Sequence, residues 1–236
     1  MMKFPTAFTE APQCLQCCNA ATTAAELKAA LAVRREYVLP GMPMPYMEDV
    51  VRAFRVAQGA AVYIEIGTQD RGNIAWLARE KLARNATIID IDYGVYSDSE
   101  RRLATELKAQ GFDYHLVRGD CLSDPVQEAV HSILNGRVAD LIFCDSHYTY
   151  EHTISEFALY RPLVRSGGYL LFHDAQWPGR MDAKGEEAKK GKGYAILELD
   201  RFYPAWMVVG PDTPLHRPLP TSSWEGHWGT LAVFPC

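Results

Sequence analysis

A glycine-containing turn follows the apolar run 61–66 and could bring the backbone close to a ligand. Glu65 lies at the end of this run, and Gly67 and Gly72 follow it before a helical stretch. Glycine lets the backbone approach a ligand closely, and the first turn of a helix presents unpaired amide groups. The spacing therefore predicts a ligand-binding turn, although a glycine after a strand is also typical of a simple tight turn.

The same turn disfavours two common nucleotide-binding motifs. A phosphate-binding P-loop needs Lys and Ser or Thr after its glycine, whereas Gly72 is followed by Asn73 and Ile74. The dinucleotide fingerprint needs G-x-G-x-x-G, and Gln69 stands at its second glycine position. A nucleoside triphosphate is therefore disfavoured, and nicotinamide and flavin nucleotides become secondary hypotheses.

Carboxylates end the next two apolar runs. Asp92 lies about 20 residues beyond Gly72, where an acidic group accepts hydrogen bonds from ribose hydroxyls. Asp90 is the nearby competitor for this role. The third run ends in Gly119 and Asp120, and the Asp120 carboxylate could accept a hydrogen bond from an adenine amino group.

Short apolar runs that alternate with helical stretches must position these residues. Such a pattern predicts an α/β fold in which a doubly wound, mostly parallel sheet is covered by helices on both faces. Because open sheets of this kind bind ligands at the carboxyl ends of their strands, the carboxylates and the glycine turn should meet there. The last two runs lie close together and predict an antiparallel pair at one edge. The runs are 61–67, 86–92, 114–120, 140–145, 168–174, 205–210 and 228–234.

The first part of the chain has a different pattern. Residues 23–37 are predicted to form an amphipathic helix capped by Thr22 or Thr23, and a second helix is predicted from about Tyr46 to Ala57. We therefore expect residues 1–57 to form an N-terminal extension that could cover the substrate site. Residues 58–236 are expected to form the catalytic domain.

The segment CDSHYTYEHTISEFALYRPLVRSGGYLLFHD, from Cys144 to Asp174, resembles class I S-adenosylmethionine-dependent methyltransferases, as do Glu65-x-Gly67, Asp92 and Gly119-Asp120. The similarity covers about residues 60–235 and is greatest to the small-molecule O-methyltransferase branch. It implies a Rossmann-like sheet of seven strands in the order 3-2-1-4-5-7-6, with the last strand antiparallel. It also implies that S-adenosylmethionine (SAM) is the cofactor.

The resemblance assigns roles to individual residues. Glu65 and Gly67 would hold the methionine portion of SAM, Asp92 the ribose and Asp120 the adenine. The family often has a second glycine in the first turn, where this chain has Gln69. The predicted cofactor-binding set is Glu65, Gly67, Thr68, Gly72, Asp92, Asp120 and Asp145.

Catalytic candidates follow the fourth apolar run. Methyl transfer is an in-line displacement at a sulfonium, so the protein must align the acceptor and remove the proton of a hydroxyl. His147 is the first choice for general base because imidazole ordinarily titrates near neutrality, although the family more often has its histidine at the position of Tyr148. Asp145 and Tyr148 complete the predicted catalytic set. Glu151, His152 and Glu156 are predicted to be surface or capping groups of the following helix.

Some related O-methyltransferases bind a divalent metal, and the resemblance carries that site onto Asp145, His173 and Asp174. Magnesium or manganese at this place could bind substrate oxygens and lower the pKa of an acceptor hydroxyl. A histidine among the ligands disfavours magnesium. The alternative is that these strand-end carboxylates only cap the helices that follow.

Composition restricts the partners of this 236-residue chain. A formal net charge of −5 gives no overall positive field that would attract nucleic acid. The sequence contains no stretch of about 18 apolar residues that could span a membrane. The six cysteines are scattered, which favours a reducing compartment and hence the cytoplasm, and the group Cys14, Cys17 and Cys18 is interpreted as free thiols. Residues 181–193 are charged and glycine-rich, typical of a lid or of a solvated loop.

The sequence therefore predicts a SAM-dependent O-methyltransferase that acts on a small hydroxylated molecule. Two alternatives stay open: a nicotinamide-dependent oxidoreductase, which shares the fold, and a protein that binds the cofactor without catalysis. Association into a homo-oligomer is left open as well.

Overall fold

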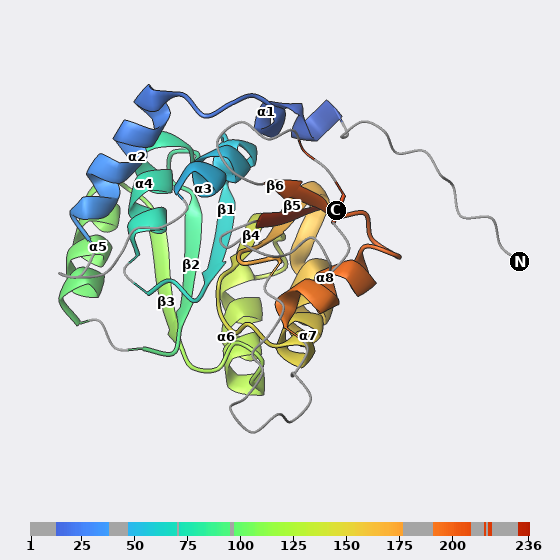
Figure 1. The fold of residues 1–236 in the computed structure, drawn as a ribbon. Helices are drawn as coiled ribbons and strands as arrows, with labels where there is room; N and C mark the ends of the chain where they lie inside the picture. The colour runs from blue at the N-terminus through green and yellow to red at the C-terminus, as the bar shows by residue number, and fades with distance from the viewer. Residues whose placement is uncertain are drawn as a thin grey trace, which may run out of the picture.

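The protein folds around one seven-stranded sheet (Figure 1). The computed structural model describes residues 13–37, 47–69, 71–94, 97–176, 191–208, 215, 217–218 and 231–236. Most of the glycine-rich segment 181–193 lies outside these residues, so its predicted role as lid or solvated loop stays a prediction.

The strand order β3-β2-β1-β4-β5-β7-β6 confirms the predicted topology. The first five strands are parallel, and β7 runs antiparallel to both of its neighbours, β5 and β6. Every predicted apolar run overlaps a strand. The strands are β1 (Val62–Ile66), β2 (Thr87–Asp92), β3 (Asp113–Arg118), β4 (Ala139–Cys144), β5 (Val164–Phe172), β6 (Trp206–Val208) and β7 (Leu231–Pro235).

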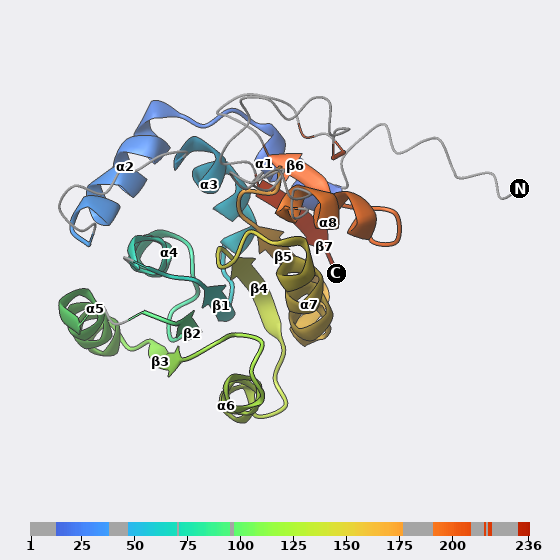
Figure 2. The same cartoon turned by 60° about the horizontal axis from the view of Figure 1, so that its bottom comes forward.

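Helices cover both faces of the sheet, as the near-continuous apolar strands require (Figure 2). Alternate side chains of β1 point to opposite faces: Tyr63 belongs to one hydrophobic core, and Ile64 and Ile66 belong to the other. The first core includes residues of α4 (Gly72–Glu80) and α5 (Ser97–Ala109). The second core includes residues of α6 (Asp124–Leu134), α7 (Tyr150–Tyr160) and α8 (Lys192–Leu199).

The N-terminal elements pack into the first of these cores. Both predicted helices are present, as α2 (Ala24–Arg35) and as α3 (Met47–Ala53) followed by a 3₁₀ turn (Phe54–Ala57). Phe54 lies edge-on to Phe143 of β4, with ring centroids 4.9 Å apart. The described N-terminal residues are therefore continuous with the core of the sheet. The sequence did not predict a 3₁₀ turn (Gln13–Leu15) and the short helix α1 (Gln16–Asn19), which precede them.

A capping box begins α2. The Thr23 hydroxyl accepts a hydrogen bond from the Glu26 backbone N–H at 3.2 Å, and the Glu26 carboxylate accepts one from the Thr23 N–H at 2.9 Å. Of the two capping residues that the sequence left open, Thr23 is the cap. This pair satisfies two backbone donors that the first turn of a helix leaves without partners.

Two further observations bear on the composition. Cys17, Cys18, Cys121, Cys144 and Cys236 are free thiols. Within the described part of the chain, every helix is too short or too polar to cross a bilayer.

Candidate active site

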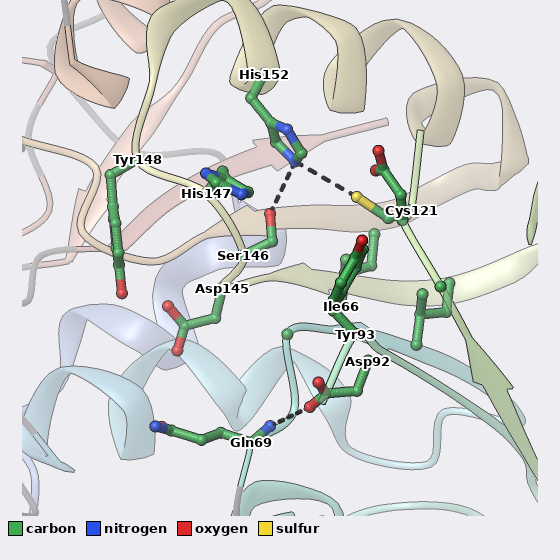
Figure 3. Close-up of a pocket in the computed structure, with 14 residues that line it drawn as sticks. Ile66, Gln69, Asp92, Tyr93, Cys121, Asp145, Ser146, His147, Tyr148 and His152 are labelled. Carbon is green, nitrogen blue, oxygen red and sulfur yellow. Dashed lines mark hydrogen bonds between the residues drawn. The ribbon is translucent and has the colours of Figure 1, made fainter. Parts of the chain in front are cut away.

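A pocket of about 490 Å³ opens at the carboxyl ends of the parallel strands (Figure 3). Four of the predicted cofactor-binding residues line it, namely Gly67, Asp92, Asp120 and Asp145, as do the catalytic candidates His147 and Tyr148. Its position agrees with the binding crevice of open α/β sheets, and its volume is typical of small-molecule sites. The other lining residues are Ile66, Gln69, Ile91, Tyr93, Gly119, Cys121, Ser146 and His152.

Gly67 lies where two strand ends come into close contact. Its φ of +82° is in the left-handed region, and a Cβ atom built on it would lie 2.4 Å from the backbone oxygen of Asp145. The Asp145 N–H donates to the Ile66 carbonyl at 2.8 Å, which holds the two segments together. Only glycine fits this position, so the predicted turn has a steric cause as well as a conformational one.

Asp92 is the carboxylate of β2 that faces the pocket. One of its oxygens, Oδ2, accepts a hydrogen bond from the Gln69 N–H at 2.6 Å and another from the Thr68 hydroxyl at 2.9 Å. The other, Oδ1, accepts from the Gly94 N–H at 2.7 Å. These bonds fix the carboxylate at the pocket wall. Gln69 has a φ of +48°, so this turn adopts a glycine-like conformation without a glycine.

Asp90, the alternative to Asp92, belongs instead to a buried ion-pair network. It is fully buried, and its carboxylate accepts from Arg71 Nε at 2.8 Å and from the Tyr114 hydroxyl at 2.5 Å. Arg71 also binds Glu100 at 2.9 Å. This buried network holds the turn in place. Asp90 is not among the residues that line the pocket.

Three predicted cofactor-binding residues lie behind the pocket surface rather than on it. Thr68 is buried and bonded to Asp90 at 2.6 Å, and Gly72 begins α4. Glu65 is buried and accepts hydrogen bonds from the Tyr63 hydroxyl at 2.6 Å and from Asn73 Nδ2 at 3.2 Å. Burial raises the pKa of Glu65 to about 8.

Asp145, His173 and Asp174 come together, as the sequence predicts. His173 Nδ1 lies 3.1 Å from Asp145 Oδ1 and 3.5 Å from Asp174 Oδ2. Burial by itself would lower the pKa of His173, but the two carboxylates outweigh it and raise that pKa to about 10. The protonated imidazole therefore supplies the positive charge between the carboxylates. Ligand atoms of all three side chains lie within 4.8 Å of one another, which is compact enough for a divalent ion in place of that proton.

The remaining catalytic candidates lie in the segment that joins β4 to α7. His147 is exposed, and its ring centroid lies 4.8 Å from that of His152. Burial raises the pKa of Tyr148, whose ring centroid lies 5.0 Å from Lys192 Nζ. Figure 3 shows Asp145 and Tyr148 on one side of the pocket and Cys121 on the other.

The prediction for two residues of α7 was wrong. The sequence placed His152 and Glu156 on the surface or in a cap, but Glu156 is fully buried and the His152 side chain is only 13% exposed. The cap of α7 is Thr149, whose hydroxyl accepts from the His152 N–H at 3.4 Å. A spacing of three, four and seven residues was a signal for this buried face, whose members are Thr153, Glu156, Phe157 and Tyr160.

Cys121, Ser146 and His152 line the pocket, although none of them was predicted to belong to the site. Cys121 Sγ lies 3.4 Å from His152 Nε2, and the Ser146 hydroxyl lies 3.2 Å from the same nitrogen. The Cys121–His152 contact joins residues 31 positions apart in the sequence, so it depends on the fold.

Comparison with known proteins agrees with the fold. Residues 64–175 match a family model described as a methyltransferase domain. A curated protein of Acanthamoeba polyphaga mimivirus, itself uncharacterized, is 26% identical over 117 residues, which are 48% of this chain and 51% of the viral protein. The chain therefore matches only about half the length of this relative.

Two solved structures resemble the whole chain. The O-methyltransferase TomG of Streptomyces achromogenes, involved in tomaymycin synthesis and solved with SAM, is 16% identical, with 91% of each chain covered and a TM-score of 0.56. The O-methyltransferase of Bacillus cereus, solved with S-adenosylhomocysteine (SAH), is 18% identical over 91% of this chain and 92% of its own, with a TM-score of 0.54. At these identities the likeness shows a shared fold. Nothing in these matches supports the oxidoreductase alternative.

Proposed function

We propose that the chain is a class I S-adenosylmethionine-dependent methyltransferase and that it methylates a hydroxyl oxygen of a small molecule. The observation that carries this proposal is the pocket. It is lined both by Asp92, a fixed carboxylate suited to binding ribose hydroxyls, and by His147, an imidazole suited to accepting a proton. SAM would supply an activated methyl group on a sulfonium, so the protein needs to align the acceptor and remove one proton.

We assign the cofactor to the part of the pocket beside β1, β2 and β3. Asp92 would accept hydrogen bonds from the ribose hydroxyls, and Asp120, which is exposed at the end of β3, would accept one from the adenine amino group. Gly67, which lines the pocket at the end of β1, would lie beside the methionine portion. Glu65, Thr68 and Gly72 act by holding this turn in place, because their side chains or backbone lie behind it.

The acceptor hydroxyl would lie near Asp145, His147 and Tyr148. His147 is assigned as general base because it is an exposed imidazole on the pocket wall. Tyr148 is assigned as a hydrogen-bond donor that orients the acceptor, since its raised pKa keeps the phenol protonated. Asp145, which is bonded to His173 at 3.1 Å, would help to orient the acceptor.

Asp145, His173 and Asp174 are the residues that would hold a divalent metal. A set of two carboxylates and one imidazole favours manganese over magnesium. An ion at this place would lower the pKa of an acceptor hydroxyl. Binding would require His173 to lose its proton, so metal affinity should fall as the pH is lowered.

Transfer of labelled methyl groups from SAM to a panel of phenols, catechols, sugar hydroxyls, amines and thiols tests the proposal. We expect a methyl ether as product. His147→Gln should lower kcat by about 10²- to 10⁴-fold and leave SAH affinity unchanged, because the base acts on the acceptor and not on the cofactor. His131→Gln is the matched control, since His131 is an exposed histidine of α6 that does not line the pocket.

A second pair of variants separates cofactor binding from transfer. Asp92→Ala should weaken SAH binding about 10- to 100-fold, whereas Asp145→Ala should mainly reduce transfer. Products methylated only on nitrogen or sulfur would contradict the hydroxyl acceptor. The reverse pattern in the two variants would contradict the assigned roles.

A further inference from the structure

Cys121, His152 and Glu156 converge beside the pocket from two different elements. Cys121 lies in the loop between β3 and α6, and His152 and Glu156 lie one turn apart on α7. Figure 3 shows the Cys121 and His152 side chains pointing toward one another. No step of the proposed methyl transfer uses these three residues.

The distances among their ligand atoms form a nearly equilateral triangle. Cys121 Sγ lies 3.4 Å from His152 Nε2 and 3.6 Å from Glu156 Oε1, and Nε2 lies 3.5 Å from Oε1. Zinc bonds of about 2.3 Å to sulfur and about 2.0 to 2.1 Å to nitrogen and oxygen place the ligands of a tetrahedron roughly 3.3 to 3.6 Å apart. All three distances therefore suit one tetrahedral ion.

The surroundings also favour a cation. Glu156 is fully buried, and its Oε2 atom has no hydrogen-bond partner among the described residues. The Ser146 hydroxyl donates to the other oxygen, Oε1, at 2.5 Å, which fixes the orientation of the carboxylate. A buried carboxylate with an unsatisfied oxygen is costly unless a positive charge lies close to it.

We propose that Cys121, His152 and Glu156 form a zinc site, distinct from the Asp145, His173 and Asp174 cluster. A water molecule completes the tetrahedron. As the sulfur–zinc bond forms, the Cys121 thiol releases its proton to solvent, and no electron is transferred. The thiolate and the carboxylate together carry two negative charges, which balance the charge of Zn²⁺. A soft thiolate ligand selects zinc over magnesium and manganese.

The bound ion would connect two walls of the pocket. Cys121 is on the wall that follows β3, and His152 is on the wall formed by α7. A ligand that binds only the folded state stabilises it by a free energy that grows with the logarithm of its affinity and concentration. Zinc should therefore raise the thermal stability of the protein, and its removal should loosen both walls. This expectation does not depend on the identity of the methyl acceptor.

Cobalt substitution tests the site directly. The metal-stripped full-length protein is titrated with Co²⁺ while its near-ultraviolet absorption is recorded, because a thiolate ligand produces a charge-transfer band. We expect one equivalent of Co²⁺ to produce the band and one equivalent of Zn²⁺ to abolish it. The Asp145 cluster contains no sulfur and cannot produce such a band.

Variants identify the thiolate. Cys121→Ser should lose the band, and His152→Gln should weaken the binding of Co²⁺. Cys236→Ser, which changes a partly exposed thiol outside the cluster, should behave as wild type. Circular dichroism establishes that each variant is folded, and His152→Gln serves as the test if Cys121→Ser does not fold.

Three results would overturn the site. They are the absence of a charge-transfer band in the folded wild-type protein, a band unchanged by both substitutions, and a band lost in Cys17→Ser, which would place the thiolate in the N-terminal extension.

Discussion

Replacing Gly67 by alanine tests the close contact that shapes the pocket. The new Cβ atom would lie 2.4 Å from the Asp145 carbonyl oxygen and 2.9 Å from the Ser146 nitrogen, both of them backbone atoms that a side-chain rotation cannot move. The left-handed φ of +82° adds a cost of about 1–2 kcal/mol for a residue with a side chain. Relief of the clash adds about 1–3 kcal/mol, so the expected loss in the free energy of unfolding is about 2–5 kcal/mol.

Gly136→Ala is the matched control for the strain. Gly136 has a nearly identical φ of +78°, but an added Cβ atom would have no neighbour within 4 Å. This variant should therefore lose only about 1–2 kcal/mol. Urea unfolding measures both losses, and calorimetric titration with SAH measures the pocket. Gly67→Ala should also bind SAH more weakly, because Asp145 and Ser146 must move. Equal destabilisation of the two variants, with unchanged SAH binding, would refute the argument.

The remaining predictions concern buried charge, pH and helix capping. Arg71→Met should cost about 3–5 kcal/mol in urea unfolding because it leaves the buried Asp90 carboxylate without its cation, whereas Arg101→Met, at an exposed ion pair, should cost less than about 1 kcal/mol; similar losses would contradict the network. Burial raises the pKa of Glu65 in the folded state to about 8, from an ordinary 4.5. The free energy of unfolding of wild type, relative to that of Glu65→Gln, should therefore be greatest below pH 4.5. It should fall by a few kcal/mol as the pH rises to about 8. Unfolding of the cofactor-free proteins at pH 5 and pH 8.5 measures this difference, and a constant value would contradict it. Thr23→Ala should cost about 1 kcal/mol in thermal unfolding through loss of the capping box, and an unchanged melting temperature would count against that cap.

The sheet was predictable because most of its strands are buried on both faces, although the edge strand β3 is partly exposed. Each apolar run has the length expected of a buried strand, and the family resemblance supplied the strand order and the antiparallel edge. The helices of the N-terminal extension were predictable from their periodicity, but the short helix α1 was not, because four residues are too few to show a period.

The pocket was predictable only in part, for a physical reason. Residues that follow strand ends, such as Asp92 and Asp145, are placed by the sheet itself, so their convergence follows from the topology. The choice between Asp92 and Asp90 depended on Arg71, whose left-handed backbone turns its side chain into the buried network. The convergence of Cys121 with α7 depended on tertiary packing, which no local pattern encodes.

The same distinction explains the error at Glu156. The surface prediction treated Glu156 as a group at the start of a helix, where a glutamate is usually solvated and interacts favourably with the helix dipole. In the structure α7 begins at Tyr150, so Glu156 lies beyond its first turn. The apolar periodicity of α7 pointed the other way, and packing against the second core prevailed. A polar residue on a buried helical face therefore indicates a local function more strongly than its residue type alone.

Calorimetric titration of the metal-stripped protein with SAH and, separately, with NAD tests the central claim most directly. The account predicts saturable binding of one SAH per chain, weakened in Asp92→Ala, and no binding of NAD. Binding of NAD alone, or SAH binding that is unaffected by Asp92→Ala in a folded variant, would contradict the assignment of this pocket to SAM.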